Sequence, residues 1–99
     1  MTFEEIVEAA LAELPPELAR GLQNVAIVIE EERAGDPDLY GLWEADEYMP
    51  DKITIFRRPL VRSFPDEHEL QEEIRITVLH ELAHYFGIDE DRLDELGYS

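Results

Sequence analysis

The run His80-Glu81-Leu82-Ala83-His84 constrains this chain more than any other stretch, because its two histidines can act together only on a helix. Residues four apart on an α-helix lie about 40° apart around the axis, with Cβ atoms roughly 6 Å apart. Both imidazoles can then reach one metal ion at about 2.0–2.1 Å, the zinc–nitrogen distance. Glu81 lies about 100° from His80 and about 60° from His84, beside such a metal rather than on it. The run therefore predicts a helical metal site with a neighbouring carboxylate.

The surroundings of the run favour a metal site over a chance match. It lies among apolar residues of its helix, where ionisable side chains need partners: Ile74, Ile76, Val78, Leu79, Leu82 and Phe86. Gly87 follows His84 at the spacing of the extended pattern H-E-x-x-H-x-x-G-x-x-(H or D). In zinc peptidases with this pattern the histidines bind the metal, and the glutamate is the base for zinc-bound water, whose pKa falls to about 7. We predict that His80 and His84 bind zinc and that Glu81 is the general base.

The longer run HELAHYFGIDEDRLDEL resembles the signature of the small bacterial minimal-zincin family of zinc metallopeptidases. Upstream, Gly41-Leu42-Trp43 and the segment 50–60 are similar to that family's Gly-Leu-aromatic turn and its strand. The likeness covers most of the chain. It implies an α+β fold in which a small twisted sheet packs against a long metal-binding helix. It also implies one Zn²⁺ per chain and a peptide or protein substrate.

The resemblance implies a third metal ligand as well. The family usually has aspartate three residues after the glycine, and this chain has Glu90 there. Gly87 can adopt the left-handed conformation that ends a helix, so the following chain can fold back towards the metal. Asp91 is the nearest rival, and Asp89 is closer to the glycine but is suited to cap the last helix. A catalytic zinc site usually has three protein ligands, so we expect His80, His84 and Glu90.

Length and composition narrow the classes of protein. Ninety-nine residues suit one domain, 1–99, and the absence of cysteine excludes a disulfide framework and Cys-ligated zinc. The formal net charge of −17 argues against nucleic acid and anionic membrane as partners. The N-terminus lacks a basic region followed by an apolar run, and no apolar stretch is long enough to span a membrane. We therefore expect a cytoplasmic protein.

Hydrophobic periodicity and capping residues predict the elements. Thr2 and Glu5 form a capping box, and Asn24–Glu32 reads as a strand covered on both faces. The second half of the long helix is apolar nearly all round, which predicts that it lies inside the core. The expected ranges are helix 3–14, a helical turn 16–21, strand 24–32, an irregular connection 34–51, strand 52–58, a helix from about 66 to 86 after a cap at Ser63, and helix 89–96.

Four basic residues in 52–62 have two interpretations. Lys52, Arg57, Arg58 and Arg62 could hold a substrate carboxylate or neutralise the acidic run 30–32, and we favour neutralisation because opposite charges commonly pair across strands. The apolar residues of the connection predict a wall or lid beside the site, or a plug for a small core. They are Tyr40, Leu42, Trp43, Tyr48 and Met49.

Zinc-dependent hydrolysis of peptide bonds is the function that the sequence favours. An exposed edge of the strand 52–58 could align an extended peptide by strand addition. Tyr48, Tyr85 and Tyr98 are candidate donors to the oxyanion, and Thr77 and Glu73 could support the histidines. His68 lies about 18 Å along the helix axis from His80 and is expected to be exposed. The alternatives are a non-catalytic, metal-stabilised binding or regulatory module and an acidic inhibitor or mimic.

Overall fold

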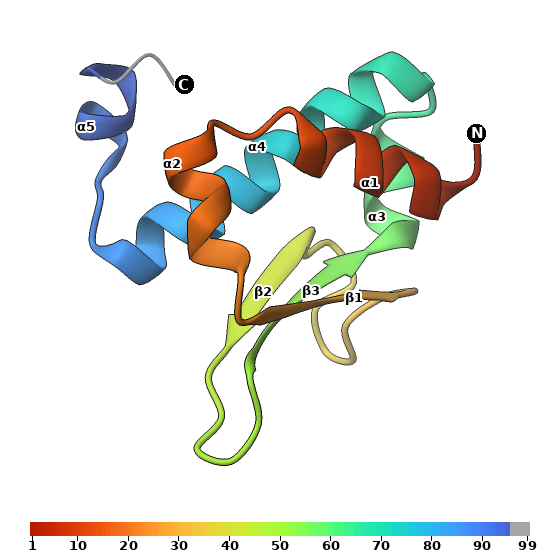
Figure 1. The fold of residues 1–99 in the computed structure, drawn as a ribbon. Helices are drawn as coiled ribbons and strands as arrows, with labels where there is room; N and C mark the ends of the chain where they lie inside the picture. The colour runs from red at the N-terminus through yellow and green to blue at the C-terminus, as the bar shows by residue number, and fades with distance from the viewer. Residues whose placement is uncertain (96–99) are drawn as a thin grey trace.

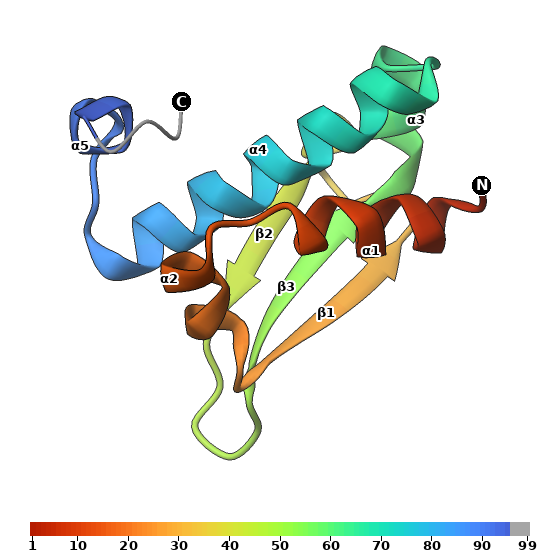
Figure 2. The ribbon, with the colours of Figure 1, turned by 45° about the horizontal axis from the view of Figure 1, so that its top comes forward.

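The computed structural model describes residues 1–95, apart from the side chains of Glu90 and Leu93, and it contains a small mixed sheet with helices packed on it. In Figures 1 and 2 the helices lie on one side of the three strands. The predicted α+β class is confirmed. In chain order the elements are α1 (Phe3–Ala12), α2 (Pro16–Ala19), the 3₁₀ helix η1 (Arg20–Leu22), β1 (Val25–Glu30), β2 (Gly41–Glu44), β3 (Asp51–Phe56), α3 (Arg57–Ser63), α4 (Glu67–Phe86) and α5 (Glu90–Glu95).

The strand order is β1-β3-β2, with β1 parallel and β2 antiparallel to β3. The expectation that the segment 52–58 is an exposed edge is therefore wrong, because β3 is the central strand and its backbone groups pair on both sides. β2 also lies inside the stretch 34–51 that we expected to be irregular. The sheet's outer strands are β1 and β2.

The prediction that 24–32 is a strand is confirmed for Val25–Glu30, but its covering on both faces is wrong. Ala26 is exposed and no residue of β1 is fully buried. The reason is topological: β1 is at the edge of the sheet, and its helices lie on one face only (Figure 2). An apolar run signals burial but not how many faces are covered.

The core forms between β3 and the long helix α4. Ile53 and Ile55, two apart on β3, share a face because strand side chains alternate. Ile74, Val78 and Leu82 recur at helical spacing on α4, and none of the five side chains is exposed to solvent. α1 packs along the side of α4 and adds a further row to this core: Ile6, Val7 and Ala10.

Local signals set the helix starts. The Thr2 capping box is confirmed, with both of its hydrogen bonds to and from Glu5 present. α4 begins after Asp66, whose carboxylate accepts a hydrogen bond from the Glu69 N–H at 3.0 Å. Ser63 is not the cap that we expected, because it is the last residue of α3, a helix that the sequence reading took partly as strand.

No helix among residues 1–95 is both long enough and apolar enough to cross a bilayer.

Surface ion pairs join the sheet to α3. Arg57 donates to both carboxylate oxygens of Glu31, and Arg58 lies 3.2 Å from Glu32. The hydrogen bonds from Arg57 are the main cause that lowers the pKa of Glu31. The predicted neutralisation of the acidic run is thus confirmed for these two arginines. Lys52 instead pairs with Glu44, and Arg62 with Asp38.

Candidate metal centre

The histidines of the motif lie on the open side of α4. Its second half buries Thr77, Val78, Leu79, Leu82 and Ala83. His80 and His84 are exposed, and Glu81 is half-buried between the two regions. The expectation that this half of the helix is enclosed all round is therefore wrong, because the apolar residues leave one stripe free and both histidines belong to it. His68 is exposed, as predicted.

The polar atoms of this stripe are available for a ligand. Among the residues that the structure describes, no hydrogen bond or ion pair engages the side chains of His80, Glu81 or His84. Two imidazoles at helical spacing i, i+4 suit Zn²⁺, which takes neutral imidazole nitrogen and carboxylate oxygen as ligands. The donor chemistry of the pair therefore fits the metal.

The structure does not test the predicted third ligand. Within the described residues, no group of three or more histidine, aspartate or glutamate side chains is gathered as a metal site. Glu90 begins α5, but its side chain is among those not described, so its role stays a prediction. The described residues thus supply the two imidazoles of the predicted ligand set.

Helix α4 ends after the motif at Gly87, as predicted. Gly87 has φ +69°, and the N–H groups of Gly87 and Ile88 donate to the carbonyls of His84 and Ala83. This pair of bonds is the Schellman arrangement, which ends a helix on a left-handed residue. α5 then lies apart from the sheet (Figures 1 and 2). The predicted helix 89–96 is confirmed for Glu90–Glu95, and Leu96 lies outside the described residues.

Asp89 is occupied as a cap, as expected. Its carboxylate oxygen accepts a hydrogen bond from the Arg92 N–H at 2.8 Å. A capping oxygen satisfies a backbone donor that α5 cannot satisfy itself. This role disfavours Asp89 as a metal ligand and leaves Glu90 and the exposed Asp91 as the neighbouring candidates.

Strand β2 lies directly beside Glu81, which the sequence reading missed. A Cβ built on Gly41 would lie 2.7 Å from Cγ2 of Thr77 and 4.0 Å from Cγ of Glu81. Only glycine lets the strand backbone approach α4 this closely. The hydroxyl of Thr77 donates to the Glu73 carbonyl at 2.8 Å, so it is engaged by the helix backbone and not by a histidine. The two aromatic residues of the run 40–43, a residue type favoured in strands, were the signal for a strand here.

The aromatic residues of the connection divide into two groups. Trp43 stacks on Tyr85, with ring centroids 4.3 Å apart, and Tyr40 packs against the core. Tyr48 is 90% exposed, so for it the expected wall or plug is wrong, whereas Met49 is 67% exposed and lines a surface cavity together with Tyr85. The Asp46 carboxylate accepts hydrogen bonds from their backbone N–H groups, which lowers its pKa.

Of the candidate oxyanion donors, Tyr85 lies closest to the motif in the chain, because it directly follows His84. Its ring is held against Trp43. Tyr48 belongs to the hairpin between β2 and β3, which projects away from α4 (Figure 1). Tyr98 lies outside the described residues.

Comparison with known proteins gives one family. Residues 22–98 match the family model described as zincin-like metallopeptidase. The match spans β1 to α5 and includes both histidines, Glu81 and the strand beside them. No curated protein matches the chain.

The close approach of β2 to α4 generates a testable prediction. Gly41→Ala should lower the free energy of unfolding by about 1–3 kcal/mol, because its new methyl group overpacks against Thr77. Thr77→Ser removes the opposing methyl and keeps the hydroxyl that donates to Glu73. Urea denaturation of both single variants and the double variant forms a cycle, in which the double variant should recover most of the loss. If the losses in the free energy of unfolding instead add up in the double variant, the contact between position 41 and Thr77 is not what destabilises Gly41→Ala.

Proposed function

This chain belongs to the zincin-like metallopeptidase family, and from that premise we propose that it hydrolyses peptide bonds with one Zn²⁺ held by His80, His84 and Glu90. The observation that supports the proposal is the free stripe of α4, where two exposed histidines and Glu81 have no partner among the described residues. When bound, zinc supplies a Lewis acid that polarises the scissile carbonyl and lowers the pKa of water.

Glu81 is proposed to move the proton. Its carboxylate accepts a proton from the attacking water and then donates it to the leaving amine. Its position supports this role, since its stem lies between α4 and β2 and its carboxylate has no competing partner among the described residues. Gly41 brings the backbone of β2 close to this same residue.

The edge of β2 is the proposed track for the substrate. Among the described residues, β2 pairs only with β3, so the backbone groups along its other side are available to an extended peptide. A peptide added there would lie beside Glu81, whereas β3, which we had expected to present an edge, is central and has no free side.

Metal binding is the first test of the proposal. The purified protein should bind about one zinc per chain, and added zinc should raise its melting temperature, because the metal binds the folded state. His80→Ala and His84→Ala should each abolish binding. His68→Ala is the matched control, since His68 is an exposed histidine of the same helix. Elemental analysis and thermal melts measure both effects, and equal zinc loss in all three variants would contradict the assignment.

The role of Glu81 is tested by Glu81→Gln. Glutamine is nearly isosteric but cannot accept the proton, so the variant should keep zinc and the fold and lose peptide hydrolysis. A mass-spectrometric digest of a peptide library measures turnover, with zinc content determined on the same sample. Hydrolysis undiminished in the variant would remove Glu81 from the mechanism. Zinc binding without turnover in the parent would favour the metal-stabilised binding module.

Substitutions at Glu90 and at its neighbour Asp91 test which residue is the third metal ligand. Glu90→Ala should weaken zinc binding strongly, whereas Asp91→Ala should change it little, and Glu90→Asp should be tolerated because it restores the family's residue type. Competition with a zinc chelator measures the three affinities. Loss of zinc in Asp91→Ala but not in Glu90→Ala would assign the third ligand to Asp91 instead of Glu90.

A further inference from the structure

A cavity of about 340 Å³ has Tyr85, near the C-terminal end of α4, in its lining. Its lining comes from η1 and the two residues after it, the start of β1, the start of β3 and the C-terminal end of α4. Tyr85 forms part of its wall and directly follows His84 in the chain. A ligand in this cavity would therefore contact the residue that follows the second histidine of the motif.

Packing between distant segments holds the walls in place. A Cβ on Gly21 would lie 2.6 Å from the Phe86 ring, so the backbone of η1 packs directly against the end of α4. Trp43 stacks on Tyr85 at an interplanar angle of 13°, and its indole N–H donates to the Asp51 carboxylate at 3.1 Å. Tyr85 and Asp51 thus face the cavity from positions fixed by the same indole.

Free hydrogen-bond donors gather on one side of this cavity. Arg20, Gln23 and Asn24 line it, and their side chains have no hydrogen bond or ion pair among the described residues. Asp51, the acidic residue of the lining, is engaged by Trp43. Six other basic side chains form ion pairs with carboxylates: Lys52, Arg57, Arg58, Arg62, Arg75 and Arg92. In a chain of net charge −17, an arginine left unpaired beside a cavity points to an anionic ligand.

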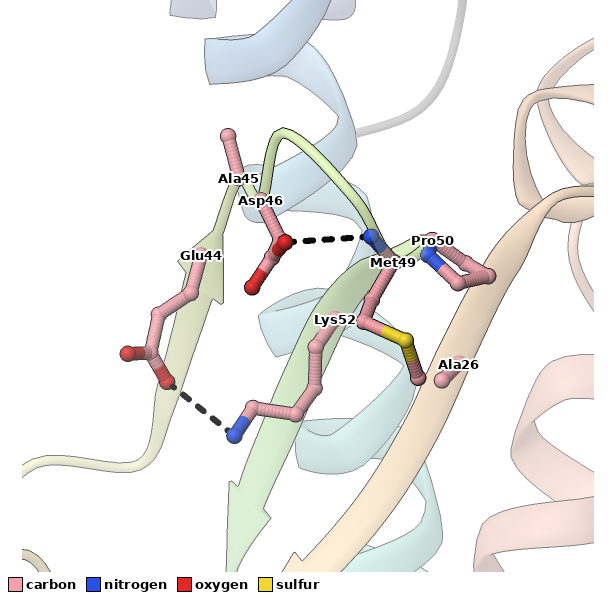
Figure 3. Close-up of a pocket in the computed structure, with 7 residues that line it drawn as sticks. All are labelled: Ala26, Glu44, Ala45, Asp46, Met49, Pro50 and Lys52. Carbon is pink, nitrogen blue, oxygen red and sulfur yellow. Dashed lines mark hydrogen bonds and ion pairs between the residues drawn. The ribbon is translucent and has the colours of Figure 1, made fainter.

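A second hollow, shown in Figure 3, provides a contrast. It lies beside the same hairpin and is also lined by charged residues, but these residues are paired within the chain. Glu44 pairs with Lys52 at 3.7 Å, and Asp46 accepts the Met49 N–H at 3.0 Å. Of the two hollows, the one at Tyr85 offers a free cation together with free amide donors.

We propose that the cavity at Tyr85 binds the C-terminal carboxylate of the substrate peptide, with Arg20 as its charge partner. A guanidinium matches a carboxylate with two parallel hydrogen bonds, and the amides of Gln23 and Asn24 can donate further ones. Met49 and Tyr85 offer exposed apolar surface to an apolar terminal side chain.

This inference rests on the proposed peptidase function and specifies its substrate class. An extended peptide advances about 3.3–3.6 Å per residue, so a carboxylate held beside Tyr85 places the scissile bond within a few residues of the C-terminus. The substrates are then peptides with a free C-terminus and an apolar last residue, and the products are short C-terminal fragments.

Binding of matched peptides tests the inference without turnover. An alanine-rich peptide ending in phenylalanine is compared with its C-terminal amide, using the zinc-loaded Glu81→Gln protein. Trp43 is the single tryptophan and stacks on Tyr85, so its fluorescence reports binding, and calorimetry supplies the affinity. The free acid should bind about tenfold or more tightly than the amide, the difference expected for hydrogen bonds to a charged group.

Two arginine substitutions supply the control. Arg20→Gln should remove the preference for the free acid, whereas Arg33→Gln should keep it, because Arg33 is exposed and also without an ion pair among the described residues. Circular dichroism checks that both variants fold. Equal affinities for acid and amide, equal effects of the two substitutions, or no binding of either peptide would overturn the inference. Failure of the peptidase function appears separately, as absent turnover in the parent with the acid preference intact.

Discussion

The burial of α4 on β3 is the interaction on which the rest of the structure depends. Ile53 and Ile55 meet the row Ile74, Val78 and Leu82, and this contact fixes the rotation of the helix about its axis. His80 and His84 follow Val78 by two and six residues, so they point about 160° and 120° away from it. The same packing that forms the core therefore turns both imidazoles outwards, where a metal and a substrate can reach them.

Local chemistry accounts for the parts of the fold that the sequence predicted well. The reciprocal hydrogen bonds of Thr2 and Glu5 and the left-handed Gly87 depend on residues only a few positions apart, so a short window contains the whole cause. The histidine pair also follows from local sequence, since residues four apart lie on the same face of any α-helix. The side chain of Glu90 does not, because its approach to a metal depends on how the chain folds back beyond Gly87.

Strand order and helix rotation depend on contacts between distant residues, and there the sequence reading went wrong. β3 looks like an edge strand because Lys52 and the arginines after it are charged, yet its partners β1 and β2 come from other parts of the chain. Pro59 lies in the first turn of α3, where a missing N–H costs nothing, so it did not break the helix that follows β3. The apolar neighbours of His80 likewise indicated that this part of α4 is buried, but they did not indicate which side of the helix faces the core.

The division of α4 into a buried and an open side separates stability from chemistry. Substitutions on the open stripe remove little packing, since exposed side chains contribute little to the free energy of unfolding. The contact that links the two sides is the approach of Gly41 to Thr77 and Glu81, because it ties the edge strand to the helix at the level of the proposed base. Trp43, two residues further along β2, extends that link to Tyr85 and the cavity beyond it. One short strand, absent from the sequence-based reading, thus connects the histidine pair, the proposed base and the cavity with its free arginine.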